Sequence, residues 1–266
     1  MRKFLLILIV LYSCTQIKGN IGLIEIKGII IDHEDKLKEI EYFIKNPFIK
    51  ALVLYINSPG GSASSSYEIF SALKRFKEKT NKKIYAYIQT IGASGGYYVA
   101  CAGDKIFSDP NALTGSIGAR ISIIYYYDLL KKIGIYEKTI KSGKYKDIGS
   151  PFREMTKEEE KILENFVMDV YEEFLKTVTR ERKIPVERLK EFADGSIFSG
   201  KRAKEIGLVD DVLSFEEFKE VLKRDFSLKE IKFIRAPVRK KGIWKKLFEI
   251  RSKLFYPEIK IEYRFP

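Results

Sequence analysis

Hydrophobic residues follow two different periods along the chain, and these periods predict alternating strands and helices. Some segments are wholly apolar or alternate with polar residues, as strands do, whereas others repeat an apolar residue every three or four positions, as helices do. Because strands and helices alternate, we expect βα units and a largely parallel sheet. The predicted strands are 21–31, 51–57, 83–89, 105–108, 121–126 and 136–141, and the predicted helices are 34–46, 63–79, 127–132, 156–182 and one starting at Pro185.

The longest predicted helix has a well-marked start. Thr156 and Glu159 form a T-x-x-E capping box, in which each side chain satisfies a backbone N–H at the helix N-terminus. Further along the chain, 194–212 predicts a turn, a short helix and a second turn. The apolar stripe of the long helix is Leu163, Phe166, Val170, Phe174 and Val178.

The domain organisation follows from length and continuity. The 266 residues suffice for one large or two small domains. Since no internal repeat or low-complexity linker divides the chain, we expect one α/β domain over 21–225. An N-terminal segment, 1–20, precedes it and a C-terminal tail, 226–266, follows it.

The N-terminal segment has the composition of a targeting signal. Arg2 and Lys3 precede an apolar run, 4–12, and small residues follow. The run is short for a bilayer span, which takes about 20 apolar residues. Leu11–Cys14 also resembles a bacterial lipobox, which would place a lipid on Cys14. A cleaved signal, a lipidated Cys14 and a retained short anchor are the alternatives, and each places the body outside the cytoplasm or on a membrane.

Positive charge is concentrated in the tail. The formal net charge is +13, and Lys232–Pro266 holds eleven Lys or Arg against three Glu, which is +8 and leaves +5 for the rest. Within the tail, 240–255 combines apolar residues at helical spacing with lysines and arginines, the pattern of a helix at a membrane interface. A helix packed on its own domain or on a neighbouring subunit explains the pattern equally well. We expect no nucleic-acid partner.

Cysteine and histidine are scarce. The chain has one histidine, His33, and two cysteines, Cys14 and Cys101. None of them has the spacing of metal ligands, so we expect no zinc, no disulfide framework and no cofactor.

A turn of small residues follows the strand predicted at 83–89. It holds Ser94 between Gly92 and the pair Gly95 and Gly96, and it opens into a helical run. Glycines permit backbone angles that a Cβ forbids, and free N–H groups at a helix N-terminus favour developing negative charge. These are features of a nucleophile elbow, although the spacing is not G-x-S-x-G. A turn kept small only for packing is the alternative.

A second glycine turn, Ser58–Ser62, follows the strand predicted at 51–57. In a parallel sheet both turns would lie at the same edge, the carboxyl ends of the strands. The N–H of Gly60 or Gly61 would then point to the same place as that of Gly95. Two such donors form an oxyanion hole, in which each donor commonly contributes about 2.7–4 kcal/mol to acyl transfer.

Five motifs occur in a specific order between residues 21 and about 225. They are Y-I-N-S-P-G-G-S (Tyr55–Ser62), G-A-S-G-G-Y-Y (Gly92–Tyr98), L-T-G-S-I-G (Leu113–Gly118), K-D-I-G-S-P-F-R-E-M-T (Lys146–Thr156) and F-S-G-K-R-A-K-E-I-G-L-V-D (Phe198–Asp210). Together they resemble the signal peptide peptidase A family (peptidase family S49), in its short single-domain form, within the Clp-protease/crotonase superfamily. The resemblance implies an α/β, Clp-protease/crotonase-like fold of repeated ββα and βα units, to which the long helix and the basic tail are added.

The resemblance also implies a serine–lysine dyad. Ser94 would be the nucleophile, Lys146 the general base, and Ser116 the residue that holds the lysine amine. A serine needs a base within hydrogen-bond reach, and the one histidine, His33, lies far upstream. Because lysine is a base only when neutral, and burial favours the neutral form, we expect Lys146 to be buried near Ser94 and Ser116.

The residues alone leave other interpretations open. Lys146 could equally be a solvated lysine in a basic loop with Lys141 and Lys144. A crotonase-type acyl-CoA enzyme would share the fold and the oxyanion hole without needing Lys146, and an inactive scaffold would need neither.

With the resemblance, we expect a membrane-associated serine endopeptidase that cleaves released signal peptides and similar apolar peptides. It would assemble as a homo-oligomeric ring at the bacterial cell membrane, with its catalytic body on the extracytoplasmic side.

Overall fold

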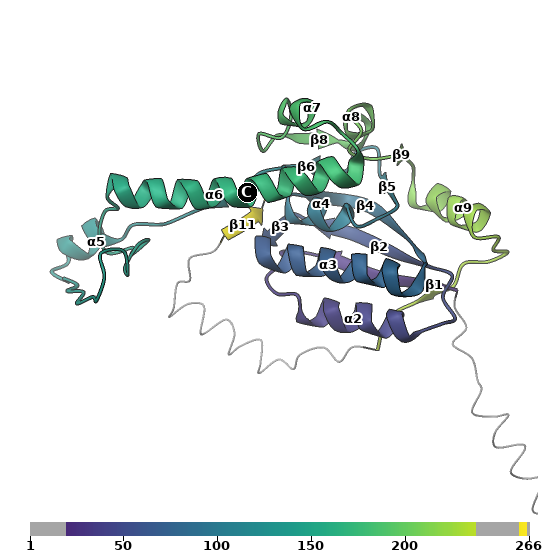
Figure 1. The fold of residues 1–266 in the computed structure, drawn as a ribbon, viewed down its shortest axis with the longest axis horizontal. Coiled ribbons are helices and arrows are strands. Elements are labelled where there is room, and N and C mark those ends of the chain that lie inside the picture. Colours follow the sequence, from purple (N-terminus) through teal and green to yellow (C-terminus); the bar gives the residue numbers. More distant parts are fainter. Residues whose placement is uncertain (1–19, 238–260, 265–266) are drawn as a thin grey trace, which may run out of the picture.

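The computed structural model describes residues 20–237 and 261–264. Its centre is a sheet whose main path runs β10–β1–β2–β4–β5–β9, with every neighbouring pair parallel (Figure 1). The predicted α/β class and largely parallel sheet are therefore confirmed. The strands are β1 (Ile21–Lys27), β2 (Ala51–Ser58), β4 (Lys83–Ala93), β5 (Lys105–Ser108), β9 (Asp211–Val212) and β10 (Phe233–Ile234).

Alternate residues of the central strands fill two separate cores. In β2, Leu52 and Leu54 point to one face of the sheet, and Ala51 and Val53 point to the other. Burial on both faces explains why these strands are almost wholly apolar. The first face is covered by α2 (Glu34–Lys45), α3 (Ala63–Thr80), α4 (Gly95–Ala100) and part of α6 (Lys157–Arg182), and the second by α9 (Phe215–Asp225).

β4 is the strand that leads into the Ser94 turn. It pairs with β2 along most of its length, while on its other side its first part pairs with β5 and its last residues, Ile91–Ala93, pair with β6 (Leu113–Gly115). β6 pairs antiparallel with β8 (Ile197–Ser199), and α8 (Gly200–Glu205) contacts both strands. The short helix α7 (Val186–Lys190) packs on α6.

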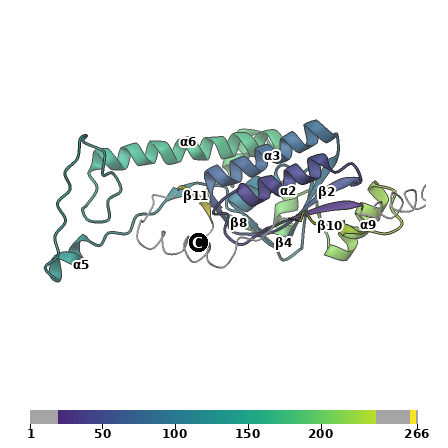
Figure 2. The same ribbon diagram turned by 90° about the horizontal axis from the view of Figure 1, so that it is seen from below.

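The long helix α6 extends beyond the body of the protein. Its C-terminal half is anchored in the core by Phe174, whereas Phe166, nearer its start, is half exposed. The N-terminal end carries a mostly irregular segment, 122–156, which we call the arm and which contains α5 (Tyr127–Lys132) (Figures 1 and 2). The predicted capping box between Thr156 and Glu159 is confirmed.

The strands predicted in the arm are wrong. Of 121–126, only Ile121 is in a strand, the short β7 (Arg120–Ile121), and 136–141 has no regular structure. Extended backbone needs a neighbouring strand to satisfy its N–H and C=O groups, and the described residues place no strand beside these segments.

Several short strands were missed. Ser58–Ser62, predicted as a turn, contains β3 (Gly60–Ser62), which pairs with β11 (Ile261–Arg264). β8 and β9 lie within 194–212, where only turns and a helix were predicted. β3, β8 and β9 have only two or three residues, which is too few to display a hydrophobic period.

The predicted signal segment with Cys14 and the predicted interfacial helix at 240–255 lie outside the described residues. The main sheet continues past Asp225, because Phe233–Ile234 pairs with β1. Among residues 20–237 and 261–264, no helix is both long and apolar enough to cross a membrane.

Candidate active site

Ser94 occupies a strained turn between β4 and α4. Its φ and ψ are 53° and −122°, and residues other than glycine rarely adopt a positive φ. The Ser94 N–H donates to the Gly115 carbonyl (2.8 Å), and the Tyr98 N–H donates to the Ser94 carbonyl (2.8 Å). Strain of this kind persists where the surrounding structure enforces it, and it is concentrated at functional sites. The geometry is that of a nucleophile elbow at the N-terminus of α4.

The two glycine turns lie side by side, as the sequence predicts. Ser58, at the end of β2, is the register partner of Gly92, near the end of β4. A Cβ on Gly96 would lie 2.6 Å from the Ser58 carbonyl oxygen, so the first turn of α4 packs directly on the backbone of Ser58. Only glycine fits at this contact, which fixes the Ser94 turn against the Ser58–Ser62 turn.

Hydrogen bonds separate the roles of Gly60 and Gly61. The Ser58 hydroxyl accepts from the Gly60 N–H (3.1 Å) and donates to the Gly28 carbonyl (2.6 Å). The Gly60 amide is therefore engaged inside its own turn. Gly61, whose backbone pairs with Tyr263 of β11, and Gly95, in the first turn of α4, remain the candidates for oxyanion donors.

Ser116 lies next to the Ser94 turn. It directly follows Gly115, whose carbonyl accepts from the Ser94 N–H, and it too has a positive φ, of 50°. Its own N–H donates to the Ser196 carbonyl (2.7 Å). The structure thus brings Ser94, Ser116 and both glycine turns to one edge of the sheet.

Lys146 lies elsewhere. Its side chain is exposed on the arm, and its ammonium makes no hydrogen bond or ion pair with any residue that the structure describes. The arm is attached to the first turn of α6, where Arg153 pairs with Glu159 (2.5 Å).

The Ser94 turn is attached to the other half of the same helix. Tyr98, in α4, packs against Phe174 with ring centroids 5.1 Å apart. Glu159 and Phe174 are separated by about 22 Å along α6 at 1.5 Å per residue. The expectation that Lys146 is buried beside Ser94 is therefore wrong within a single chain.

An ion-pair network fixes the arm to α6. The Arg153 guanidinium contacts Asp147 (2.8 Å) as well as Glu159. Hydrogen bonding from Arg153, with a further hydrogen bond from the Thr156 N–H, lowers the pKa of Glu159 to about 2. Arg153 likewise holds the pKa of Asp147 well below its usual value.

Acid should release this part of the arm. The pKa values of Glu159 and Asp147 are depressed in the folded state. Their contribution to the stability of the contact between the arm and α6 is therefore complete above their pKa values in the unfolded chain, about 4, and is lost as the pH falls toward 2. We expect hydrogen exchange of 141–155, corrected for intrinsic rates, to accelerate over that range before the core strands open. Glu159→Gln should accelerate it already at pH 7, and Glu160→Gln is the matched control. Unchanged exchange in the Glu159→Gln chain would contradict the network's role.

Ser94→Gly should stabilise the fold while removing the hydroxyl. The strain of a residue with a side chain at this φ costs about 1–3 kcal/mol, and glycine would relieve it. Glycine also loses about 0.5–1 kcal/mol more chain entropy on folding. The free energy of unfolding should therefore rise by about 1 kcal/mol. Ser94→Ala keeps the Cβ and the strain and should match the wild type. Urea unfolding compares the three chains. A Ser94→Gly chain less stable than Ser94→Ala would show that the turn is not strained.

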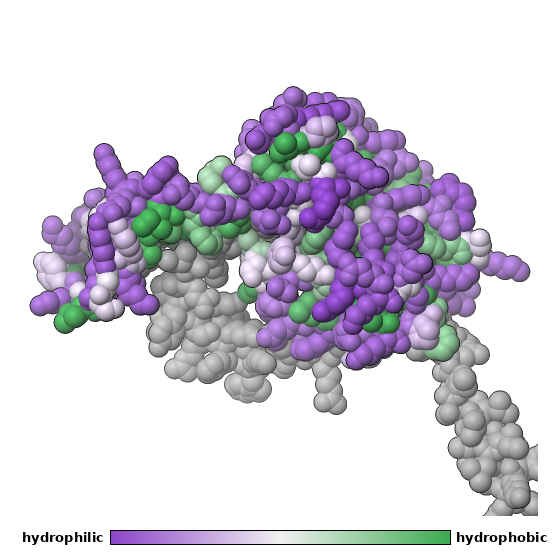
Figure 3. All heavy atoms as spheres, in the orientation of Figure 1, coloured by the Kyte–Doolittle hydropathy of each residue, from purple (hydrophilic) through white to green (hydrophobic). Residues whose placement is uncertain are grey.

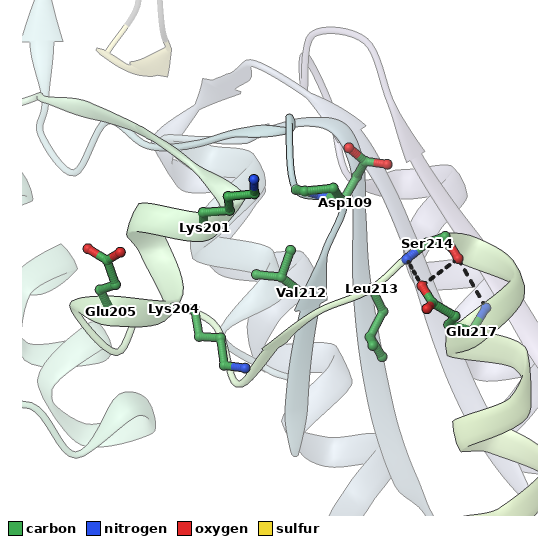
Figure 4. A pocket seen from close by; sticks show the side chains of 9 residues that line it. Asp109, Lys201, Lys204, Glu205, Val212, Leu213, Ser214 and Glu217 are labelled. Carbon is green, nitrogen blue, oxygen red and sulfur yellow. Dashed lines mark hydrogen bonds between the residues drawn. The ribbon is translucent and has the colours of Figure 1, made fainter.

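Two open hollows lie on the surface of the described residues. One, of about 590 Å³, lies where α8, β9 and the start of α9 meet (Figure 4). Two of its charged groups have structural partners, since Lys204 pairs with Asp211 (2.6 Å) and Glu217 caps α9 with Ser214. The other, of about 490 Å³, lies between β7 and α6. It is lined by Ala119, Arg120, Ile121, Ile123, Tyr125, Met155, Glu160, Leu163, Glu164 and Val167.

Two features of the site escaped sequence reasoning. Ser58 lies in a motif that was noted for its glycines, but its bonds to Gly28 and Gly60 depend on the tertiary structure. The strand β11 was also missed, although 259–265 (I-K-I-E-Y-R-F) alternates apolar and polar residues as a strand does. His33, the one histidine, has its Nδ1 3.3 Å from the Ser65 hydroxyl.

The fold and the Ser94 turn define the class, a Clp-protease-like α/β protein with a serine at a nucleophile elbow. Two family profiles match the sequence, Clp protease over residues 32–114 and Peptidase family S49 over residues 76–229. The second match covers more than half of the chain, and the chain belongs to peptidase family S49.

Curated relatives agree with this assignment. A candidate protease of Methanocaldococcus jannaschii is 39% identical over 187 residues, which is 68% of this chain and 60% of the relative. A candidate signal peptide peptidase of Enterococcus faecium is 37% identical, over 74% of this chain and 57% of the relative. A candidate protease of Synechocystis is 39% identical, over 77% of this chain and 74% of the relative. The chain therefore spans less than two thirds of the length of the first two relatives.

Proposed function

We propose that this chain is a serine endopeptidase with Ser94 as its nucleophile. The observation that carries the proposal is the strained Ser94 turn, held at the N-terminus of α4 beside the glycine turn of β3. Membership of peptidase family S49 supports it. In this arrangement the amides of Gly61 and Gly95 would stabilise the oxyanion that forms at the substrate carbonyl.

The base would come from a second copy of the chain. Lys146 is exposed on an arm fixed to the N-terminal end of α6, whereas the Ser94 turn packs on the other half of that helix, which argues against a base from the same chain. The same arm exposes large apolar side chains, with Tyr136 77% and Ile140 90% accessible. Figure 3 shows hydrophobic residues on the arm and along the adjoining part of α6. A neighbouring copy would cover this surface and present its own Lys146, as the expected ring requires.

The chemical steps then follow from the residues. The neutral amine of Lys146 takes the Ser94 hydroxyl proton while the oxygen bonds to the substrate carbonyl carbon. The oxyanion collapses, the C–N bond breaks, and the lysine ammonium gives its proton to the leaving amine. Water, deprotonated by the same amine, then hydrolyses the acyl-enzyme and frees Ser94. Ser116 would hold the amine in line, because it directly follows the residue that binds the Ser94 N–H.

The substrate class that fits is an apolar peptide. The hollow between β7 and α6 is lined by aliphatic and aromatic residues together with Arg120, Glu160 and Glu164, and its apolar part would take hydrophobic side chains. Released signal peptides are peptides of this kind, and we propose them as substrates.

A fluorophosphonate probe tests the assignment. It should label Ser94 covalently, and Ser94→Ala should abolish both the labelling and the cleavage of an apolar fluorogenic peptide. A crotonase-type acyl-CoA enzyme or an inactive scaffold would show neither. Absence of labelling in the assembled wild-type protein would refute the peptidase assignment.

A further inference from the structure

Arg120 places a guanidinium in the hollow between β7 and α6. The residue is half-buried and lines the hollow from β7. Its Nε is fully buried and has no hydrogen-bond partner, and no ion pair joins its guanidinium to any side chain in the part of the chain that the structure describes. Removing such a donor from water without a partner costs free energy that the fold does not recover. An orphaned donor of this kind therefore indicates a ligand.

The position of Arg120 distinguishes it from other buried atoms without a partner. Asn46 Nδ2 and Thr179 Oγ1 are also buried and unpaired among the described side chains, but neither residue lines either of the two hollows. Only the guanidinium of Arg120 combines an unsatisfied donor with an open hollow and with a permanent positive charge.

Two glutamates of α6 border the same hollow. Glu160 and Glu164 are both exposed, and Glu164 pairs with Lys161 (3.4 Å). Charges in contact with water are strongly screened, so these carboxylates repel a second anion only weakly. They leave the half-buried guanidinium available for a ligand of opposite charge.

The small sheet places Arg120 close to the candidate site. Its strand order is β3–β11–β7, and Ser62, Glu262 and Arg120 lie in one row across it. Because neighbouring strands are about 4.8 Å apart, Arg120 lies about 10 Å from Ser62, the residue that follows Gly61. An extended peptide covers this distance with about three residues. A peptide held at Ser94 can therefore reach Arg120 with a residue near its cleaved bond.

We propose that Arg120 is a specificity-determining residue that binds a carboxylate of the substrate peptide. This inference rests on the proposed function of Ser94. The planar guanidinium matches a carboxylate in shape and is weakly hydrated, so it suits a pair that is partly removed from water. The preferred substrate is then an apolar peptide with one carboxylate about three residues from the cleaved bond. An Asp or Glu side chain and the C-terminus of the peptide both supply this group.

Two peptide series test the proposal and distinguish the two sources. In the first, a single Glu or Gln is moved along an apolar fluorogenic peptide that ends in an amide. In the second, peptides without Glu are shortened stepwise beyond the cleaved bond, each as free acid and as amide. In the wild type, the carboxylate at the matching position should raise kcat/KM by roughly 10- to 100-fold over its neutral counterpart. The series that shows this preference identifies the source.

Substitutions of Arg120 assign the preference. In Arg120→Gln the ratio should fall to about one, whereas fluorophosphonate labelling of Ser94 should keep its wild-type rate. Arg120→Glu should instead favour Lys at the preferred position. Glu164→Gln changes a charge in the same hollow and is the matched control, which should keep the preference for a carboxylate.

Two results would overturn the proposal. The first is the absence of any carboxylate preference in the wild type. The second is an equal ratio in the wild type and in Arg120→Gln, which would assign Arg120 to a structural pair with its register partner Glu262.

Binding separates this inference from the function itself. In a Ser94→Ala background, fluorescence anisotropy should show the carboxylate peptide binding roughly 10- to 100-fold more tightly than its neutral counterpart, and Arg120→Gln should remove the difference. If this difference appears without fluorophosphonate labelling of the wild type, Arg120 binds the carboxylate as proposed and the peptidase assignment fails. If labelling occurs and the two peptides bind equally, only the role of Arg120 fails.

Discussion

Mixed assemblies of Ser94→Ala and Lys146→Met chains should cleave peptides although neither variant does so alone. Each variant by itself should lose roughly 10³-fold or more in kcat, as enzymes do when a member of a catalytic unit is removed. In a mixed assembly, a Lys146→Met chain still supplies Ser94 and a Ser94→Ala chain still supplies Lys146. Where the two are correctly adjacent, a complete site forms. Co-expression with two affinity tags, followed by a fluorogenic peptide assay, measures the recovery.

The controls separate the base from the arm. Lys144→Met removes a lysine two residues away and should keep most activity. Since Lys146 is exposed in the single chain, Lys146→Met should leave the free energy of unfolding unchanged. Near wild-type cleavage by Lys146→Met would show that another group is the base. Two inactive variants with no recovery in the mixed assembly would show that the site is not shared between chains.

Gly61→Ala should destroy the site. Gly61 has a φ of 152°, and a Cβ there would lie 2.1 Å from the Ile30 carbonyl oxygen. That contact is with backbone, so relief requires the β3 turn to move away from the chain at Ile30. We expect a loss of about 3 kcal/mol or more in the free energy of unfolding, together with loss of cleavage. Thermal unfolding and fluorophosphonate labelling of Ser94 measure the two effects.

Gly28→Ala is the control for backbone strain without a clash. Gly28 also has a positive φ, of 68°, but nothing lies within 4 Å of an added Cβ. It should cost about 1–2 kcal/mol, the penalty of a left-handed conformation alone, and should leave Ser94 reactive. If Gly61→Ala and Gly28→Ala lower the free energy of unfolding equally, the close approach of Gly61 to Ile30 is not the reason that glycine is needed at position 61.

The sequence determined much of the body and half of the site. Almost wholly apolar strands such as 51–57 are typical of burial on both faces, as in a parallel sheet covered by helices. The order strand, glycine turn, helix occurs twice, and the parallel sheet then brings both turns to one edge. The juxtaposition of Ser94 with Ser58–Ser62 was therefore predictable from local patterns.

Only the tertiary structure decided where Lys146 and β11 lie. The burial of a lysine depends on what packs over it. The N-terminal half of α6 extends past the core that anchors Phe174, and the arm with Lys146 is attached to that end of the helix. Residues 261–264 alternate apolar and polar residues, as a strand does, but their pairing with β3 and β7 joins segments more than a hundred residues apart in the chain, which local sequence cannot encode. Local sequence encodes the periodicity of an element, but long-range contacts determine its neighbours.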